Sequence, residues 1–283
     1  MVEKDKLKVN VPKCYFTEPF GPNGENELLI MEDLSRCAAI KPIYEGLSAE
    51  SVKSVLDNLA EVHAYSLLHD QWLSDPDMKM TYLTFQKQLG GGGTEQFSNT
   101  VVSMMNVLKK EHPAVFDPLI DLFLDSCSQK FNFGESYTLH EKLGLPPVLT
   151  HGDLWMNNIM WRKTEDGKST TDELVAIVDW QVCSVEPDVR REHLDDFLQH
   201  YHSYLKWKLG REPQFTVGQM ANAYKHLFRD GVIMNLPNLG AFLQAELGMM
   251  GIENVEQQKQ DVIHRAKCLV EDMHALEDEF YSH

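Results

Sequence analysis

One stretch of the chain, residues 148–161, limits the possible fold more than any other. A short apolar run at 148–150 leads into a polar turn, and a second apolar run follows at 159–161. The turn carries the carboxylate of Asp153 and the amide of Asn158, and another apolar run at 174–178 ends at Asp179. The pattern predicts buried strands at 148–150, 159–161 and 174–178, with polar groups in the turn and at the last strand's end.

These three polar groups have the chemistry that phosphoryl transfer from a nucleotide requires. One carboxylate accepts the proton of the substrate hydroxyl, while an amide and a second carboxylate hold magnesium against the phosphates. The order His151, Asp153, Asn158 and then a strand ending in Asp179 is the kinase order. A His-Gly-Asp turn alone is common, because Gly and Asp suit turns. The added Asn158 and Asp179 favour kinase ancestry, which by itself does not establish activity.

Together with Leu154, Trp155 and the run Val178-Asp179-Trp180-Gln181, these residues resemble the CHK-kinase-like family. That family groups ecdysteroid-kinase-like proteins with relatives of choline kinases and aminoglycoside phosphotransferases. The resemblance covers nearly the whole chain and is strongest at 28–69 and 148–181. It implies an α+β, protein-kinase-like fold, with Asp153 as the catalytic base, Asn158 and Asp179 as Mg²⁺ ligands, and ATP as the donor. Gly152 stands where protein kinases carry Arg, which favours a small-molecule acceptor.

A second region of resemblance lies near the N-terminus. Apolar runs at 11–16 and 28–31 flank the turn signal Gly21-Pro22-Asn23-Gly24, so we expect a hairpin over 11–31. The second run ends in Glu32-Asp33-Leu34. In the resembled family this segment is the hinge between two lobes, and its backbone groups bind adenine. Glu32, Asp33 and Leu34 are therefore candidate nucleotide-binding residues, and the alternative is an ordinary exit from a strand into a loop.

The resemblance implies a remnant of a β-rich small lobe at 1–33 and a mainly helical large lobe at 34–283. Two departures from the family pattern stand out. Residues 1–10 are charged, featureless and free of Gly, so we expect the chain to begin after the Gly-rich loop and the strand Lys of a kinase. After Gln181 the usual Asp-Leu-x-Arg segment is replaced: either Asp188 with Arg191 is a compressed version of it, or that segment and its helix are missing.

Helical periodicity accounts for most of the remaining chain. Ser48 is the expected N-cap of a helix that runs to His69. Within it, Leu59-Ala60-Glu61-Val62-His63-Ala64 resembles a family helix beneath the active site, and we interpret His63 as structural rather than as a proton shuttle. Further helices are expected at 95–110, 116–128, 136–143, 191–208, 217–229, 237–250 and 255–280. An aromatic face formed by Phe197, Tyr201, Tyr204 and Trp207 is either core or a substrate wall.

Composition excludes several other classes. The 26 basic and 43 acidic residues give a net charge of −17, which argues against binding a nucleic-acid backbone. The five cysteines form no C-x-x-C pair, the N-terminus is no signal peptide, and no apolar run would span a bilayer. We therefore expect a cytoplasmic protein with reduced thiols and no membrane partner. Gly90–Gly93 lacks the context of a phosphate loop, and the pairs His63/His69 and His200/His202 lack zinc-site spacing.

Two functions follow from these observations. The first is an ATP- and Mg²⁺-dependent phosphotransferase that acts on the hydroxyl of a small molecule. The second is a catalytically inactive kinase-like module that binds a ligand or partner through the same cleft. No motif specifies the acceptor, because a fold-level analogy does not carry over a substrate.

Overall fold

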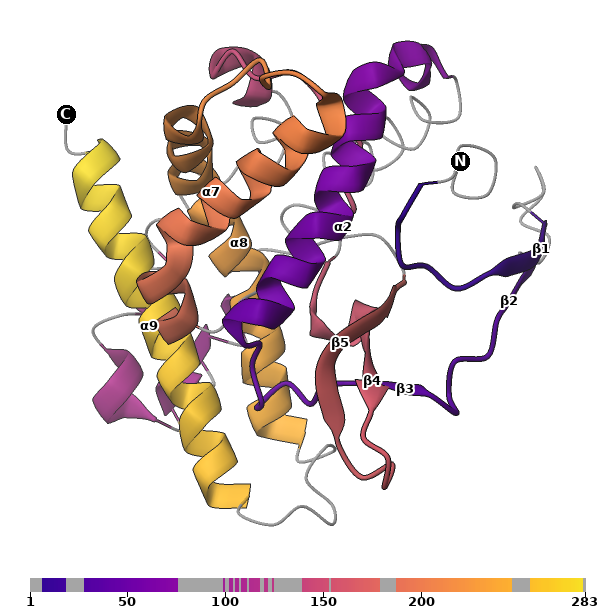
Figure 1. Cartoon of the computed structure of the whole chain (residues 1–283). Helices are drawn as coiled ribbons and strands as arrows, with labels where there is room; N and C mark the ends of the chain where they lie inside the picture. Colours follow the sequence, from indigo (N-terminus) through magenta and orange to yellow (C-terminus); the bar gives the residue numbers. More distant parts are fainter. Residues whose placement is uncertain are drawn as a thin grey trace.

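The computed structural model describes residues 7–18, 28–75, 139–152, 154–178, 187–245 and 255–281, and scattered residues between 99 and 124. In this part long helices accompany two small antiparallel sheets (Figure 1). The expected α+β class is thus confirmed, while the kinase-like fold and the division at residue 33 stay predictions. Within the described residues, no helix combines the length and apolar character needed to cross a membrane.

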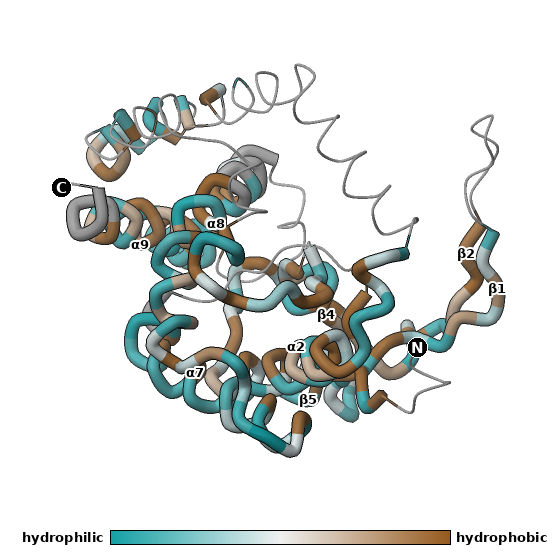
Figure 2. Tube along the Cα trace, turned by 90° about the horizontal axis from the view of Figure 1, so that it is seen from above, coloured by the Kyte–Doolittle hydropathy of each residue, from teal (hydrophilic) through white to brown (hydrophobic). Residues whose placement is uncertain are grey.

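The smaller sheet is the hairpin expected near the N-terminus. Strand β1 (Cys14–Glu18) pairs antiparallel with β2 (Leu28–Met31), and Phe16 lies opposite Ile30. Every residue of both strands is exposed. In Figure 2 this hairpin stands to one side of the helices, and β2 carries the hydrophobic colour.

The larger sheet has the order β3-β4-β5 and is antiparallel throughout. Strands β4 (Ile159–Lys163) and β5 (Thr170–Ile177) match the expected runs, and a polar turn at 164–169 joins them. Strand β3 (Ala38–Ile40) was not expected, because three residues are too few to show a period. The strand expected at 148–150 is wrong: these residues have no regular structure.

Helix α2 (Ala49–Leu68) packs on this larger sheet (Figure 1). Its N-cap is Ser48, as expected, and the Ser48 hydroxyl accepts the N–H of Ser51 at 3.1 Å. One apolar core joins α2, β4, β5, Leu154 and the first half of α7 (Pro187–Leu209). Its buried members are Leu47, Val52, Val55, Leu154, Ile159, Trp161, Leu174, Ile177 and Phe197.

Helix α7 (Pro187–Leu209) contacts both α2 and α9, and Figure 1 shows it between them. Pairs of polar side chains join α7 to α2, among them Lys208 with Glu61 and Lys53 with Asp196. Beneath these pairs lies a small core that contains Ala60, Ala64, Leu205 and Phe215.

The C-terminal half of the fold is a helical core between α8 (Val217–Ala245) and α9 (Val255–Tyr281). Two helices were expected, one ending at 229 and one starting at 237, but α8 is continuous through Pro237. A proline removes one hydrogen bond of a helix. The buried face nevertheless continues across it, and such packing outweighs local propensity. Its members are Phe228, Val232, Ile233, Leu236, Leu239 and Leu243.

The expected helices at 95–110, 116–128 and 136–143 are described only in part. Met105, Leu108, Phe116 and Ile120 are helical and fully buried against α8 and α9. Residues 139–142 are also helical. The remaining positions of these helices, and the run Gly90–Gly93, lie outside the described residues.

Candidate functional site

The expected catalytic turn and the expected strand end meet at Val178. The N–H of Val178 donates to the carbonyl oxygen of Asn158 at 2.9 Å. The carbonyl oxygen of Val178 in turn lies 3.2 Å from Nε2 of His151. Both backbone polar groups of Val178 are therefore bound by the segment 151–158, directly before position 179.

Buried apolar side chains follow Gly152 in the turn. Gly152 has φ of 80°, a left-handed conformation in which a side chain would be strained. Leu154 and Met156 on its far side are buried, at 3% and 5% exposure. A short 3-10 helix, η3 (Met156–Asn158), then leads into β4. Leu154 and Met156 thus anchor the stretch 154–158, which includes Asn158, to the protein interior.

Asn158 is the one predicted metal ligand that the structure describes. It is buried, with 8% exposure, and its backbone N–H donates to the carbonyl oxygen of Trp155 at 2.9 Å. A carboxamide oxygen is a hard ligand of the kind that Mg²⁺ prefers. Asp153 and Asp179 lie outside the described residues, so their roles stay predictions.

His151 is a buried, neutral group. Burial lowers its pKa to about 4, and the hydrogen bond to Val178 offsets this only in part. Because a carbonyl oxygen can only accept, Nε2 carries the proton and donates it to Val178. A histidine that is neutral at pH 7 and bound to backbone is suited to hold the turn against β5, not to carry a charge.

The candidate adenine segment Glu32-Asp33-Leu34 leaves β2 and turns into β3. The N–H of Glu32 donates to the carbonyl oxygen of Lys13 at 2.8 Å. The carbonyl oxygen of Leu34 accepts from Ala38 at 2.9 Å. An adenine edge would therefore have to use other backbone groups of this segment. The Asp33 carboxylate accepts the N–H of Ser35 at 2.9 Å, and hydrogen bonds with Ser35 lower its pKa.

Strand β4 connects this segment with the turn. Lys163, at the end of β4, donates its N–H to Cys37 at 2.9 Å and its amino group to Ser35 at 2.6 Å. Asn158 directly precedes the other end of β4. At about 3.3 Å per residue, the five steps from Asn158 to Lys163 span roughly 16 Å. Ser35 and Cys37, which follow the adenine candidates, and the metal candidate Asn158 thus lie at opposite ends of one short strand.

Histidine residues outside the turn have structural partners. His63 lies 2.6 Å from the hydroxyl of Tyr201, and burial lowers the pKa of His63 to about 4. His200 lies 2.7 Å from Asp57, and His202 lies 2.9 Å from the carbonyl oxygen of Phe215. In the described part of the chain, no three His, Cys, Asp or Glu side chains gather as a metal site. Asp153 and Asp179 lie outside that part, and the Mg²⁺ site stays a prediction.

The aromatic face of α7 divides into two parts. Phe197 is buried in the core beneath the sheet, and Tyr201 and Tyr204 pack against the core between α2 and α7. Core packing is therefore confirmed for these three residues. Trp207 is 65% exposed and lies under the amino group of Lys208, 4.3 Å from its ring centre.

Sequence reasoning missed a structural link at the N-terminus. The segment before Val11 was expected to be featureless, yet Val9 is buried and Asn10 connects this segment to two elements, α2 and β5. The carbonyl oxygen of Asn10 accepts the N–H of Ile177 at 2.8 Å, and its N–H donates to Asn58 in α2 at 2.7 Å. Neither Asn10 nor Asn58 belongs to a recognisable motif. The apolar period of α2 predicts that position 58 is helical, but it does not predict the hydrogen bond to Asn10.

A cavity of about 140 Å³ lies where α2 and α7 end. None of the predicted site residues lines it, so it is separate from the turn. Its lining combines apolar and charged side chains, namely Ser66, Leu67, Asp70, Leu73, Pro146, Pro147, Leu209, Arg211, Glu212 and Gln214.

Comparisons with known proteins add two relatives. A family model described as "Uncharacterized oxidoreductase dhs-27" matches residues 1–280. The Caenorhabditis elegans protein of that name is 23% identical over 245 residues, which are 78% of this chain and 28% of that protein. The C. elegans "Uncharacterized kinase-like protein D1044.1" is 25% identical over 154 residues, covering 47% of this chain and 39% of that protein. The chain thus spans less than half of either relative. No solved structure matches it.

Proposed function

We propose that this chain, which belongs to the DUF1679 family, is a phosphotransferase of the CHK-kinase-like, ecdysteroid-kinase-like type. It would transfer a phosphoryl group from ATP, with Mg²⁺, to the hydroxyl of a small molecule. The observation that carries the proposal is the pair of contacts between Val178 and the turn, to Asn158 and to His151. They hold Val178, the residue before Asp179 in the sequence, against Asn158 and His151. The similarity to a protein named kinase-like supports the same proposal.

Each residue has a distinct part in this proposal. Asp153 accepts the proton of the acceptor hydroxyl and orients it. Asn158 and Asp179 supply the oxygen ligands, a carboxamide and a carboxylate, that suit Mg²⁺. When bound, Mg²⁺ neutralises charge on the phosphate oxygens. His151 stays neutral and keeps the turn against β5.

The placement of the candidate adenine segment supports the same proposal. Glu32, Asp33 and Leu34 lie toward one end of β4, and Asn158 lies at the other. A separation of roughly 16 Å along the strand suits an extended nucleotide, with its base at one end and its phosphates at the other. Backbone groups of 32–34 would hold the base.

The alternative is a kinase-like module that binds a ligand without transferring phosphate. One observation favours it: the strands of the described small sheet, CYFTE and LLIM, contain neither a glycine nor a lysine to cover phosphates. The oxidoreductase name belongs to a relative of which this chain matches 28%. The sequence contains no G-x-G-x-x-G dinucleotide fingerprint, so no specific observation favours that activity here.

The test is transfer of labelled γ-phosphate from ATP to a panel of small alcohols, sterols and choline-like compounds included. Asp153→Asn keeps the shape of the side chain and removes the base, so we expect a loss of about 10²–10⁴-fold in turnover. The control is Asp166→Asn, an exposed carboxylate in the β4–β5 turn. An Asp153→Asn variant within twofold of the parent would contradict the assigned base. A parent that binds Mg-ATP but labels no acceptor would favour the inactive module.

A further inference from the structure

The cavity where α2 and α7 end is built from three segments. All ten residues that line it belong to the described part of the chain. The first segment is the end of α2 with the 3-10 helix η1 (Asp70–Ser74), the second is residues 146–147, and the third is residues 209–214. A ligand in this cavity would therefore contact a surface apart from the candidate turn.

Hydrogen bonds hold the three segments together. The indole N–H of Trp72 donates to the carbonyl oxygen of Ser66 at 3.1 Å, which fixes η1 against the end of α2. The hydroxyl of Ser66 accepts the N–H of Leu149 at 3.2 Å, which fixes the second segment. His202 of α7 lies 2.9 Å from the carbonyl oxygen of Phe215, directly after the third. The cavity is thus preformed, so a ligand would not have to order its walls.

Much of the lining is apolar and leaves room for one small side chain. Leucine and proline supply this apolar part, namely Leu67, Leu73, Pro146, Pro147 and Leu209. An apolar cavity of about 150 Å³ holds a benzene ring. The volume of about 140 Å³ found here therefore suits a branched aliphatic group or a single ring.

Charged residues of opposite sign reach this cavity from two sides. Asp70 and Leu73 are three residues apart in η1, so they share one face of that 3-10 helix, and both line the cavity. Arg211 and Glu212 follow the end of α7 on the other side. Glu212 is paired with Lys206. Asp70 and Arg211 are exposed, which places them where the cavity opens to solvent.

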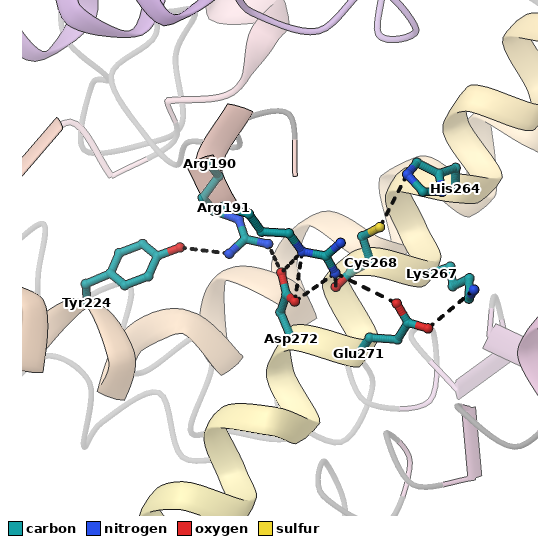
Figure 3. Close-up of polar contacts among 8 residues, drawn as sticks. All are labelled: Arg190, Arg191, Tyr224, His264, Lys267, Cys268, Glu271 and Asp272. Atoms are coloured by element: carbon teal, nitrogen blue, oxygen red, sulfur yellow. Dashed lines mark hydrogen bonds and ion pairs between the residues drawn. The ribbon is translucent and has the colours of Figure 1, made fainter. Parts of the chain in front are cut away.

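Asp70 and Arg211 differ from other charged residues near helix ends. Arg190 and Arg191, near the start of α7, both donate to Asp272 of α9 (Figure 3). Within the described residues, by contrast, the side chains of Asp70 and Arg211 form no hydrogen bond or ion pair. One negative and one positive group are therefore available to a ligand at the same cavity.

We propose that this cavity binds a small apolar α-amino acid of the leucine or phenylalanine type. The side chain of the ligand occupies the apolar part of the lining. Its carboxylate pairs with the guanidinium of Arg211, which can donate two parallel hydrogen bonds, and its ammonium group pairs with Asp70. A zwitterion matches both free charges, whereas a simple carboxylate or a simple amine matches one. This binding activity goes beyond the proposed phosphotransferase and does not depend on it.

The test is calorimetric titration of the full chain with L-leucine, L-phenylalanine and three analogues of leucine. Leucinamide lacks the carboxylate, 4-methylpentanoate lacks the ammonium group, and glycine lacks the side chain. We expect saturable binding of leucine and phenylalanine. Leucinamide and 4-methylpentanoate should each bind about tenfold more weakly than leucine, because each loses a hydrogen-bonded charge. Glycine should bind more weakly still, because it buries no apolar surface.

Two variants assign the two charges. Arg211→Gln should weaken leucine about tenfold and leave leucinamide unchanged, because leucinamide has no carboxylate to lose. Asp70→Asn should weaken leucine by a similar factor and leave 4-methylpentanoate unchanged. The matched controls are Lys168→Gln and Asp166→Asn at exposed positions of the β4–β5 turn, and they should bind every probe like the parent.

Three results would overturn the proposal. The first is that the parent binds neither leucine nor phenylalanine saturably. The second is that glycine binds as tightly as leucine. The third is that Arg211→Gln weakens leucine and leucinamide equally, or weakens neither. Leu73→Trp gives an independent check, because it enlarges a side chain of the lining and should weaken leucine and 4-methylpentanoate alike. Parental binding in Leu73→Trp would place the ligand outside this cavity.

Discussion

The backbone N–H of Val178 donates to the carbonyl oxygen of Asn158 at 2.9 Å. This bond joins the end of β5 to the turn before β4, although the two residues belong to different motifs of the sequence. It places Asn158 beside Val178, the residue that precedes Asp179 in the sequence. Ligands carried on neighbouring stretches of chain can bind the same metal ion, so the first prediction concerns the metal site.

Asp179→Ala should abolish Mg²⁺-dependent nucleotide binding, because it removes the charged member of the proposed ligand pair. Asp188→Ala, a nearby change of the same charge, should weaken binding little. Calorimetric titration of nucleotide with and without Mg²⁺ measures the difference. Equal binding by Asp179→Ala and the parent would remove Asp179 from the site.

Stability should fall as the pH is lowered from about 6.5 to about 4. His151 and His63 have pKa values of about 4 in the folded protein, whereas an unfolded histidine titrates near 6.5. In this window the unfolded chain binds more protons, so each histidine lowers the free energy of unfolding by about 1 kcal/mol per pH unit. Below about pH 4 both states are protonated and this contribution levels off.

Urea unfolding between pH 4 and 7.5 tests this dependence. His151→Gln keeps a donor for the Val178 carbonyl oxygen but does not titrate. Its free energy of unfolding should therefore depend less steeply on pH, by the contribution of one histidine. His69→Gln is the control, because His69 lies on the surface at the end of α2. An unchanged slope in His151→Gln would mean that His151 is accessible to protons in the folded state.

Asn58→Ala should destabilise the fold by about 1–3 kcal/mol. It leaves the N–H of Asn10 without the acceptor that now lies 2.7 Å away, and it also removes the bond from Asn58 to Ser54. Chemical denaturation gives the free energy of unfolding. Asn157→Ala is the control, because Asn157 is exposed. A cost below about 0.5 kcal/mol, the usual range for surface changes, would show that the N-terminal segment does not depend on this contact.

Glu61→Gln should cost about 3 kcal/mol, because it leaves the amino group of Lys208 without its buried counter-charge. Glu61 is 5% exposed, and it also accepts the hydroxyl of Tyr204 at 3.3 Å. A double-mutant cycle with Lys208→Met isolates the pair from other effects of each change. Additive effects of the two changes would indicate that the pair contributes no coupling energy.

Several elements could be predicted because the residues that specify them lie close together in the sequence. The cap at Ser48 and the apolar period of α2 lie within one helix, and the polar turn between β4 and β5 lies within one hairpin. The same holds for the order of His151, Asp153, Asn158 and Asp179, which depends on the sequence alone. Local rules failed at Pro237, where a buried face carried α8 past a residue that normally interrupts a helix.

The sequence by itself determined which chemical groups the candidate site contains and the strands and turns that carry most of them. Only the tertiary structure decided what holds these pieces in place: Asn10 against Ile177 and Asn58, and Asp272 against Arg190 and Arg191. Such contacts join residues far apart in the chain, so no spacing or period records them. They form because packing of α2, α7 and α9 brings polar groups into low-water surroundings, where each must find a partner.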